Sequence, residues 1–275
     1  MNKYSHSQLS RLTLSAAVLL SVTTAVRADL LYHFPFENAA GEKSLANTGK
    51  VGGDAAAKSV DGIESEFTRN TPSGRGYALS FPMSGNCQGG PRLVLPQSEG
   101  KLLLNKPDQA MTIAVWLKWR GPDKHPSFEQ GIVNKLSSNS KTGWSFVITD
   151  KGNLAFMMGG IGQRFSAGTV PLNVWTHVAM TLKTNGGLRF YINGQDTPLT
   201  MELGPVKCLP NDDFINVAVQ GQEFYLPVNG ALDDLRIYDE ALPADDIEML
   251  VKESQPAPAV SQPAPAVSQP APAAK

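Results

Sequence analysis

The sequence has few of the residues that build metal and nucleophile sites, and no excess of one charge. Its 275 residues include two cysteines and four histidines, and 24 basic side chains balance 25 acidic ones. No two His or Cys residues have the spacing of zinc ligands, and the Gly-x-Ser-x-Gly signature of a serine nucleophile does not occur. The near-neutral charge gives no electrostatic reason to bind nucleic acid or an anionic membrane. These features argue against a zinc enzyme, a serine hydrolase and a nucleic-acid partner.

The N-terminal segment, residues 1–28, has the pattern of an export signal. Lys3 and Arg11 form a cationic start, an apolar run covers residues 12–22, and small residues follow it. The run is too short to span a bilayer permanently, so we favour a signal over the alternatives, a membrane anchor or a buried helix. We predict cleavage before Asp29, a secreted, periplasmic or cell-surface protein, and no membrane insertion after cleavage.

Export bears on the two cysteines, Cys87 and Cys208, which form no Cys-x-x-Cys pair. In an exported protein two lone cysteines pair more often than they stay free. We therefore predict a disulfide between them, with two free thiols as the alternative.

The C-terminal segment, residues 253–275, is low in complexity. From Ser254 it repeats the heptapeptide SQPAPAV. Proline at this density blocks helix and sheet pairing and favours polyproline II. We therefore predict a disordered Pro/Ala-rich tail. It could be a spacer, a docking strand for a partner or an inert extension, and we favour a spacer.

The body, residues 29–252, reads as short strands separated by turns. The clearest strand is residues 111–119, where one face carries Met111, Ile113, Val115, Leu117 and Trp119 at a period of two. Further strands are expected over residues 29–36, 77–83, 93–95, 102–104, 131–135, 144–149, 154–158, 175–182, 188–192, 214–220 and 231–238. Strands at this spacing without alternating helices indicate antiparallel sheets packed as a sandwich. One short helix is expected over residues 243–251.

Four of these segments, in order, resemble the laminin-G-like jelly roll of the concanavalin A-like lectin and glucanase superfamily. They are residues 111–118, residues 131–148, residues 171–194 and residues 229–242 with the helix that follows. The resemblance implies an all-β, two-sheet antiparallel jelly roll whose chain ends meet on neighbouring strands. It also implies a role, because stand-alone members of this group are mostly recognition modules for glycans or extracellular proteins. A minority of the superfamily cleaves glycans.

The carboxylates argue against cleavage. Glycoside hydrolysis needs two carboxylates that face one substrate, and the Glu-x-Asp-x-x-Glu motif of the laminarinase-like enzymes is not present. Asp233 and Asp234 are adjacent, so on a regular strand they point to opposite faces and cannot share a substrate. His177 matches a position that the family usually fills with His, where it ties strands together rather than acting in catalysis. We predict a protein that is not an enzyme.

The resemblance implies one candidate ion, calcium. In many relatives an ion or polar cluster links the end of the first strand to the last strand, which here implies Glu37 and Asn38 near Asp233, with Asp234 as the lesser contributor. Calcium takes carboxylate and carbonyl oxygens in a flexible cage. Asp233 is expected on the strand face of Leu235 and therefore partly buried. The alternative is that Asp233 accepts backbone hydrogen bonds without a metal.

Ligand-binding residues are expected in loops at one end of the sandwich or on its concave face. The candidates are exposed aromatics for stacking and polar loop residues for hydrogen bonds: Trp119, Arg120, His125, Phe128, Trp144, Arg164 and Tyr225, with Phe165 as a further aromatic. The alternative for each aromatic is a place in the core, and for each charged residue a solvated surface.

We therefore predict an exported, non-catalytic recognition module that binds a carbohydrate. The alternatives are a protein-interaction or structural domain of the cell envelope or matrix, and a glycan-cleaving enzyme with an unrecognised carboxylate pair. A sugar module should show a shallow groove with a solvent-facing aromatic beside amide and charged groups. A protein-binding domain should instead show a broad apolar patch. The sequence does not indicate the oligomeric state.

Overall fold

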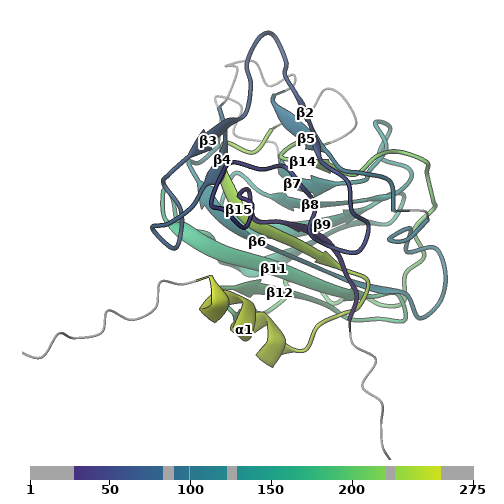
Figure 1. Ribbon diagram of the computed structural model, residues 1–275. Coiled ribbons are helices and arrows are strands. Elements are labelled where there is room, and N and C mark those ends of the chain that lie inside the picture. Colours follow the sequence, from purple (N-terminus) through teal and green to yellow (C-terminus); the bar gives the residue numbers. More distant parts are fainter. Residues whose placement is uncertain (1–27, 83–89, 99, 123–128, 221–226, 255–275) are drawn as a thin grey trace, which may run out of the picture.

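The computed structural model describes residues 28–82, 90–98, 100–122, 129–220 and 227–254, which form two packed β-sheets and one helix (Figure 1). The eight-stranded sheet has the order β13 (Gln195–Thr197), β12 (Leu188–Ile192), β11 (Trp175–Lys183), β6 (Ala110–Trp119), β15 (Gly230–Tyr238), β4 (Ala78–Phe81) and β3 (Glu66–Thr68), and β1 (Leu30–Phe34) also pairs with β15. The seven-stranded sheet has the order β10 (Gly162–Thr169), β9 (Asn153–Met158), β8 (Trp144–Ile148), β7 (Gln130–Asn134), β14 (Asn216–Val217), β5 (Arg92–Val94) and β2 (Ala56–Lys58). The named strands pair antiparallel. The predicted antiparallel sandwich is confirmed.

The core lies between the two sheets and is built from alternate residues of the strands. The predicted inner face of β6 is confirmed, since all five of its residues are buried there: Met111, Ile113, Val115, Leu117 and Trp119. Phe146 of β8 stacks on Phe190 of β12 across the sandwich, with ring centroids 6.2 Å apart and planes 15° apart. Such aromatic pairs stabilise a fold by about 0.5–1.5 kcal/mol beyond the area they bury.

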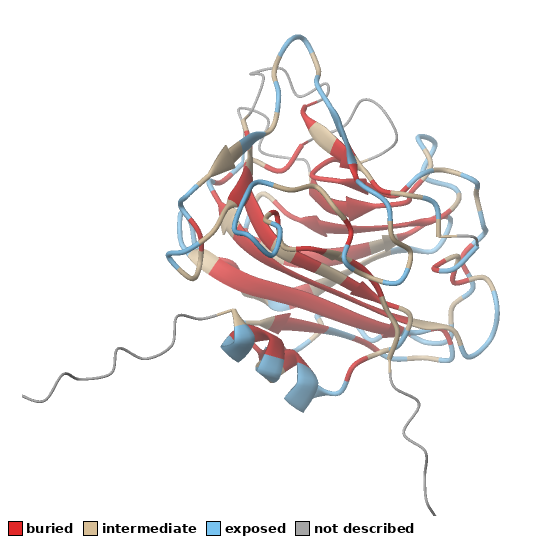
Figure 2. Cartoon of the chain, viewed as in Figure 1, coloured by how far each residue is buried: buried red, intermediate tan, exposed pale blue. Residues whose placement is uncertain are grey.

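The helix α1 (Ala244–Glu253) covers the outer face of the eight-stranded sheet beside β11 and β12 (Figures 1 and 2). Its buried residues Ile247 and Leu250 pack on a second apolar cluster that includes Ala114, Ala179 and Tyr238. Asp245 and Asp246 lie in the first turn and Lys252 in the last, where their charges complement the helix dipole. The predicted helix is confirmed and runs two residues further than expected. Within the described residues no helix has the length and apolar character to cross a membrane.

Several strands differ from the sequence-based expectation. Residues 102–104 form no strand because Leu102 and Leu104 have left-handed backbones, with φ of 63° and 53°. The strand expected over residues 214–220 shortens to β14, and β2, β3, β10 and β13 are not among the expected strands. The short strands β2 and β3 contain few of the alternating apolar residues on which the prediction depended.

A β-bulge in β15 changes the direction of its acidic side chains. The register with β6 shifts between Asp233 and Arg236, and Asp234 has a left-handed backbone with φ of 48°. Leu232 and Leu235 both point into the core, so two residues rather than one lie between them. The expectation that Asp233 shares a face with Leu235 is therefore wrong, as is the expectation that the two Asp residues point to opposite faces. A bulge inserts one extra residue into a strand and so re-aims the side chains around it.

Candidate functional site

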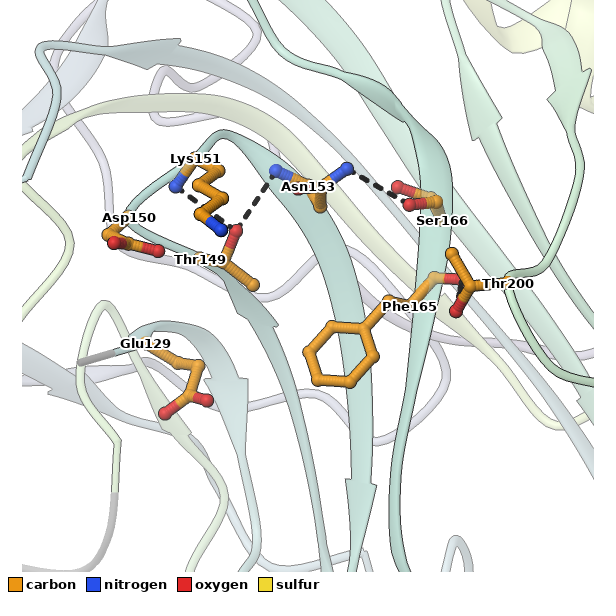
Figure 3. Close-up of a pocket in the computed structure, with 8 residues that line it drawn as sticks. All are labelled: Glu129, Thr149, Asp150, Lys151, Asn153, Phe165, Ser166 and Thr200. Carbon is orange, nitrogen blue, oxygen red and sulfur yellow. Dashed lines mark hydrogen bonds between the residues drawn. The ribbon is translucent and has the colours of Figure 1, made fainter. Parts of the chain in front are cut away.

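A shallow groove lies on the seven-stranded sheet, where the β8–β9 turn meets β10 (Figure 3). Its volume is about 320 Å³. The residues that line it combine one aromatic ring with hydroxyl, amide and charged groups: Glu129, Thr149, Asp150, Lys151, Asn153, Phe165, Ser166 and Thr200. We call this the Phe165 groove.

One wall of the Phe165 groove is a tightly bonded turn. Gly152 adopts φ of 83°, which suits glycine, and its N–H donates to the carbonyl of Thr149 at 3.0 Å. The Thr149 hydroxyl accepts the backbone N–H groups of Lys151 at 3.3 Å and Asn153 at 3.1 Å. The turn thus fixes the backbone at Asp150, Lys151 and Asn153 before any ligand arrives, which lowers the ordering cost of binding.

The Asn153 side chain joins this turn to β10. Its amide nitrogen donates to the carbonyls of Ser166 at 3.0 Å and Gly168 at 3.3 Å. Within the described part of the chain, the Asn153 carbonyl oxygen Oδ1 accepts no hydrogen bond. This oxygen is therefore an available acceptor on a rigid amide.

Phe165 supplies the aromatic surface. Its side chain is half-buried, and it pairs in register with the small residue Ala155 of β9. Its carbonyl accepts the N–H of Thr200 at 2.9 Å, which fixes the strand beneath the ring. In Figure 3 the Phe165 ring and the Glu129 carboxylate lie on different sides of the groove. The arrangement offers one apolar platform with carboxylate, amide and hydroxyl groups around it.

Two of the predicted ligand-binding aromatics are core residues. Trp119 is 3% exposed and donates its indole N–H to Oε1 of Gln130 at 2.9 Å. Trp144 is fully buried and donates to the carbonyl of Leu102 at 2.8 Å. The prediction that these two tryptophans are exposed sugar platforms is therefore wrong, because both are inward-facing strand residues with satisfied N–H groups.

The predicted arginines lie outside the groove. Arg120 donates to the carbonyl of Gly230 at 3.0 Å and to the hydroxyl of Ser80 at 2.8 Å. Arg164 donates to the carbonyls of Glu202 and Gln163 at 3.1 and 2.8 Å. The Arg120 guanidinium thus joins β15 to β4, and the Arg164 guanidinium joins β10 to the loop at Glu202. His125, Phe128 and Tyr225 lie outside the described residues, so their role stays a prediction.

A second pocket, about 340 Å³, lies on the outer face of the eight-stranded sheet at the bulge of β15. Asp234 is its most heavily bonded group. It accepts Nε2 of His33 at 2.8 Å, Nε of Arg236 at 2.9 Å and the Ser254 hydroxyl at 2.6 Å. Burial acts to raise the pKa of Asp234, but the hydrogen bond from His33 and the charge of Arg236 hold it well below its ordinary value. Asp234 is therefore an ionised structural anchor.

Asp233, in contrast to Asp234, has few groups that compensate its charge. It is 8% exposed, and the hydrogen bond to its carboxylate comes from the backbone N–H of Asp234 at 2.8 Å. Burial, with the charges of Glu37 and Asp234, raises the pKa of Asp233 to about 8. Burial also raises the pKa of Glu37, against the hydrogen bond from the Tyr77 N–H at 2.9 Å. The pocket thus holds two carboxylates whose charges repel and are poorly compensated.

These two carboxylates fit the predicted calcium site in part. Glu37 and Asp233 line one pocket and are oxygen donors of the kind that calcium prefers. Asn38 does not line it, because its Oδ1 accepts the N–H groups of Ala40 and Glu42 within its own loop. Over the described ranges no cluster of three or more His, Cys, Asp or Glu residues is arranged to hold a metal. Glu37 and Asp233 are the residues that would hold calcium, backbone carbonyls would have to complete its shell, and calcium stays a prediction.

His177 and Cys208 are both buried. His177 lies edge-on to Trp116, with ring centroids 5.4 Å apart, and burial lowers its pKa to about 4. It is a neutral core histidine. Cys208 is fully buried, and burial raises its thiol pKa to about 11. Cys87 lies outside the described residues, so the disulfide stays a prediction.

The antiparallel two-sheet sandwich defines a lectin-like jelly roll. A family model for the concanavalin A-like lectin/glucanases superfamily matches residues 94–248. The chain belongs to this superfamily, and the resemblance to laminin-G-like domains is confirmed. No curated protein matches the sequence.

Solved structures with the same fold include binding domains of toxins. Botulinum neurotoxin type C, which depends on interaction with two ganglioside molecules to enter cells, has a TM-score of 0.60 at 16% identity, over 82% of this chain and 51% of that chain. The binding domain of Paraclostridial mosquitocidal protein 1 has a TM-score of 0.58 at 17% identity, over 82% and 52%. The binding domain of botulinum neurotoxin DC, in complex with rat synaptotagmin II, has a TM-score of 0.55 at 15% identity, over 82% and 52%. The chain spans about half the length of these neighbours, and identities this low establish the fold alone.

Proposed function

We propose that this protein is an exported, non-catalytic module that binds a carbohydrate in the Phe165 groove. The observation that carries the proposal is a half-buried aromatic ring that lines a groove beside a turn with an ordered backbone and polar side chains. Sugars stack their apolar C–H faces on aromatic rings and bond their hydroxyls to polar groups around the ring. A concave site with an apolar surface and a few convergent polar groups is the usual form of a small-ligand site.

Four polar groups of the groove have complementary parts in this proposal. The carboxylates of Glu129 and Asp150 and the Oδ1 of Asn153 accept hydrogen bonds from sugar hydroxyls. The Lys151 ammonium donates to ring or hydroxyl oxygens. Hydrogen bonds to charged groups are the stronger ones, so these side chains fix the orientation of a sugar that the Phe165 ring holds loosely.

The charges of the groove favour a neutral glycan. Two carboxylates, Glu129 and Asp150, face one cation, Lys151, so a carboxylated or sulfated sugar meets a net repulsion. A neutral hexose meets none. Discrimination by a repulsive element of this kind is a common source of specificity.

The proposal that the module lies outside the cytoplasm rests on the signal pattern of residues 1–28. The Pro/Ala repeat of residues 253–275 supports the proposal that the tail is a spacer. Absence of catalysis is supported at β15, where Asp234 is bound to His33, Arg236 and Ser254 rather than free to act on a substrate. In the groove, Glu129 and Asp150 are assigned to binding sugar hydroxyls, and the assay for released reducing sugar tests this assignment.

The test is a glycan array probed with the mature chain, residues 29–275, with calcium or with EDTA. We expect binding to neutral glycans over their sialylated or sulfated counterparts, and no release of reducing sugar from the bound glycans. Silence across the array, from a protein shown to be folded by circular dichroism, would overturn the proposal. Release of reducing sugar would overturn its non-catalytic part.

A protein partner is the second candidate function, because Leu209 and Phe214 are 54% and 49% exposed on the described surface. Phe214 directly follows Asp213, whose carbonyl accepts a hydrogen bond from the ammonium of Lys135. A silent array combined with tight binding to a protein from the same envelope or matrix, lost in Phe214→Asp, would favour this candidate.

A further inference from the structure

The amide nitrogen of Asp29 lies against a carboxylate from the other end of the domain. It donates to Oδ1 of Asp239 at 3.0 Å, and the Asp239 N–H donates to the Asp29 carbonyl at 3.2 Å. Asp29 immediately precedes the first strand, β1, and Asp239 immediately follows the last, β15. The two residues therefore close the seam where the two ends of the domain pair.

The atom at this seam is the one that predicted processing would change. Hydrolysis of the Ala28–Asp29 bond consumes one water molecule. The Ala28 carbonyl carbon gains the hydroxyl oxygen and leaves as a carboxylate, and the Asp29 nitrogen, freed from the amide, takes up protons to become an α-ammonium.

We propose that cleavage before Asp29 creates an ion pair between the new α-ammonium and the Asp239 carboxylate, which fastens the first strand of the mature protein to the last. The neutral amide hydrogen bond of the uncleaved chain becomes a charge-assisted one at the same place. Charge-assisted hydrogen bonds are about twice as strong as neutral ones. The inference rests on the proposed export and is independent of glycan binding.

The charges around the seam agree with this role. Lys50 contacts the Asp29 carboxylate, and Lys101 lies 3.5 Å from Oδ2 of Asp239. These are the charged groups that the structure places on the two residues. Oδ1 of Asp239 is left to the Asp29 nitrogen, so the α-ammonium has a carboxylate oxygen that no lysine occupies.

The ion pair gives the mature protein a defined pH dependence. An α-ammonium held by a carboxylate has a pKa above the ordinary value of about 7.7–8.0 for an α-amino group. A group whose pKa is raised by folding stabilises the fold below its unfolded pKa, and this stabilisation is lost as the pH rises through the folded value. The ion pair should therefore contribute fully to the stability of the fold near pH 6, and this contribution should be lost above about pH 9.

Ala28 makes the uncleaved chain different in a second way. It is half-buried, packs against the apolar cluster under α1, and lines a groove with Tyr238, Met249 and Leu250. An uncleaved chain therefore keeps a methyl group in this groove as well as an amide at the seam. A chain that starts at Ala28 keeps the amide of Asp29 and carries its α-ammonium on Ala28. It is therefore the matched control for the chain that starts at Asp29.

The experiment begins with the chain exported by a cell that processes it. Mass spectrometry should find Asp29 as the first residue. Asp239→Asn should then lower the Tm at pH 6 by about 1–3 °C, the size expected for one partly exposed pair. The same substitution should have a smaller effect in the chain starting at Ala28, and at pH 9.5. Lys101→Gln separates the lysine contact from the terminus, and Asp54→Asn, at an exposed carboxylate elsewhere, should leave the Tm unchanged.

Each result decides one part of the inference. A different first residue overturns the processing step. Asp29 as first residue, with equal effects of Asp239→Asn in both chains and at both pH values, overturns the ion pair. An α-amine pKa below 7.7 in the mature chain, measured by NMR titration, also overturns it. Glycan binding can succeed or fail independently of these results.

Discussion

The carboxylates of Asp233 and Asp234 lie in one pocket although the two residues are neighbours on a strand. The bulge of β15 puts both on the outer face, and the pocket treats them differently. Asp234 is ionised and bonded to His33 and Arg236, whereas burial and like charges raise the pKa of Asp233 to about 8. One strand thus holds one compensated carboxylate and one uncompensated carboxylate, whose substitution should have opposite effects.

The first prediction follows from this contrast. In EDTA at pH 7.5, Asp233→Asn should raise the free energy of unfolding by about 1–3 kcal/mol, because the folded protein must protonate this carboxyl group at a pH where the unfolded chain ionises it. Asp234→Asn should lower it by about 2–4 kcal/mol, because His33 and Arg236 lose a half-buried, ionised partner. Urea unfolding measures both. A loss of stability in both variants would contradict the pocket's electrostatics.

The second prediction concerns pH, and the two carboxylates act in opposite directions. The raised pKa of Asp233 means that its folded form binds the proton more tightly than its unfolded form. The contribution of Asp233 to the free energy of unfolding is therefore greatest below about pH 4 and is lost as the pH rises to about 8. The lowered pKa of Asp234 gives a contribution that is present above about pH 4 and lost in acid. Removing Asp233 should flatten the stability curve between pH 5 and pH 8, and an unchanged slope in Asp233→Asn would contradict this assignment.

The third prediction tests calcium at Glu37 and Asp233. If these carboxylates hold the ion, saturating calcium at a hundred times its Kd should raise the free energy of unfolding by about 2.7 kcal/mol. The rise should vanish in Asp233→Asn and in Glu37→Gln and persist in Asn38→Ala, since Asn38 bonds within its own loop. Calorimetric titration showing no heat in the unaltered protein would remove calcium from the account.

The fourth prediction separates core tryptophans from ligand platforms. Trp144→Phe should cost about 1–3 kcal/mol of stability, because the buried carbonyl of Leu102 loses its partner. It should leave glycan affinity unchanged in the folded fraction, since Trp144 is fully buried. A selective loss of glycan affinity at full stability would return Trp144 to the binding site.

The sequence predicted the strands whose alternation is long and regular. Residues 111–119 are the clearest case, and the same alternation that put Trp119 on the face of Met111 also put it in the core. The polar loop that follows Trp119 nonetheless favours a place on a binding rim. The period along the strand was the better guide.

The bulge and the groove could not be predicted in this way. Asp234 adopts its left-handed backbone among partners such as His33, which lies 201 residues away. The Phe165 groove gathers Glu129, the turn after β8 and Thr200, which are far apart in the sequence. The sequence indicates Phe165 as a candidate aromatic, but only the pairing of β9 with β10 brings it beside Asn153.

The most direct measurement is a titration of the best array glycan into the mature protein and two matched variants. Phe165→Ala removes the proposed platform. Phe214→Ala removes an exposed phenylalanine just before β14, in the same sheet but at the end opposite the groove. The account predicts an affinity loss of about tenfold or more, roughly 1.4 kcal/mol, in Phe165→Ala and none in Phe214→Ala. Equal affinity in the unaltered protein and Phe165→Ala would contradict the central claim.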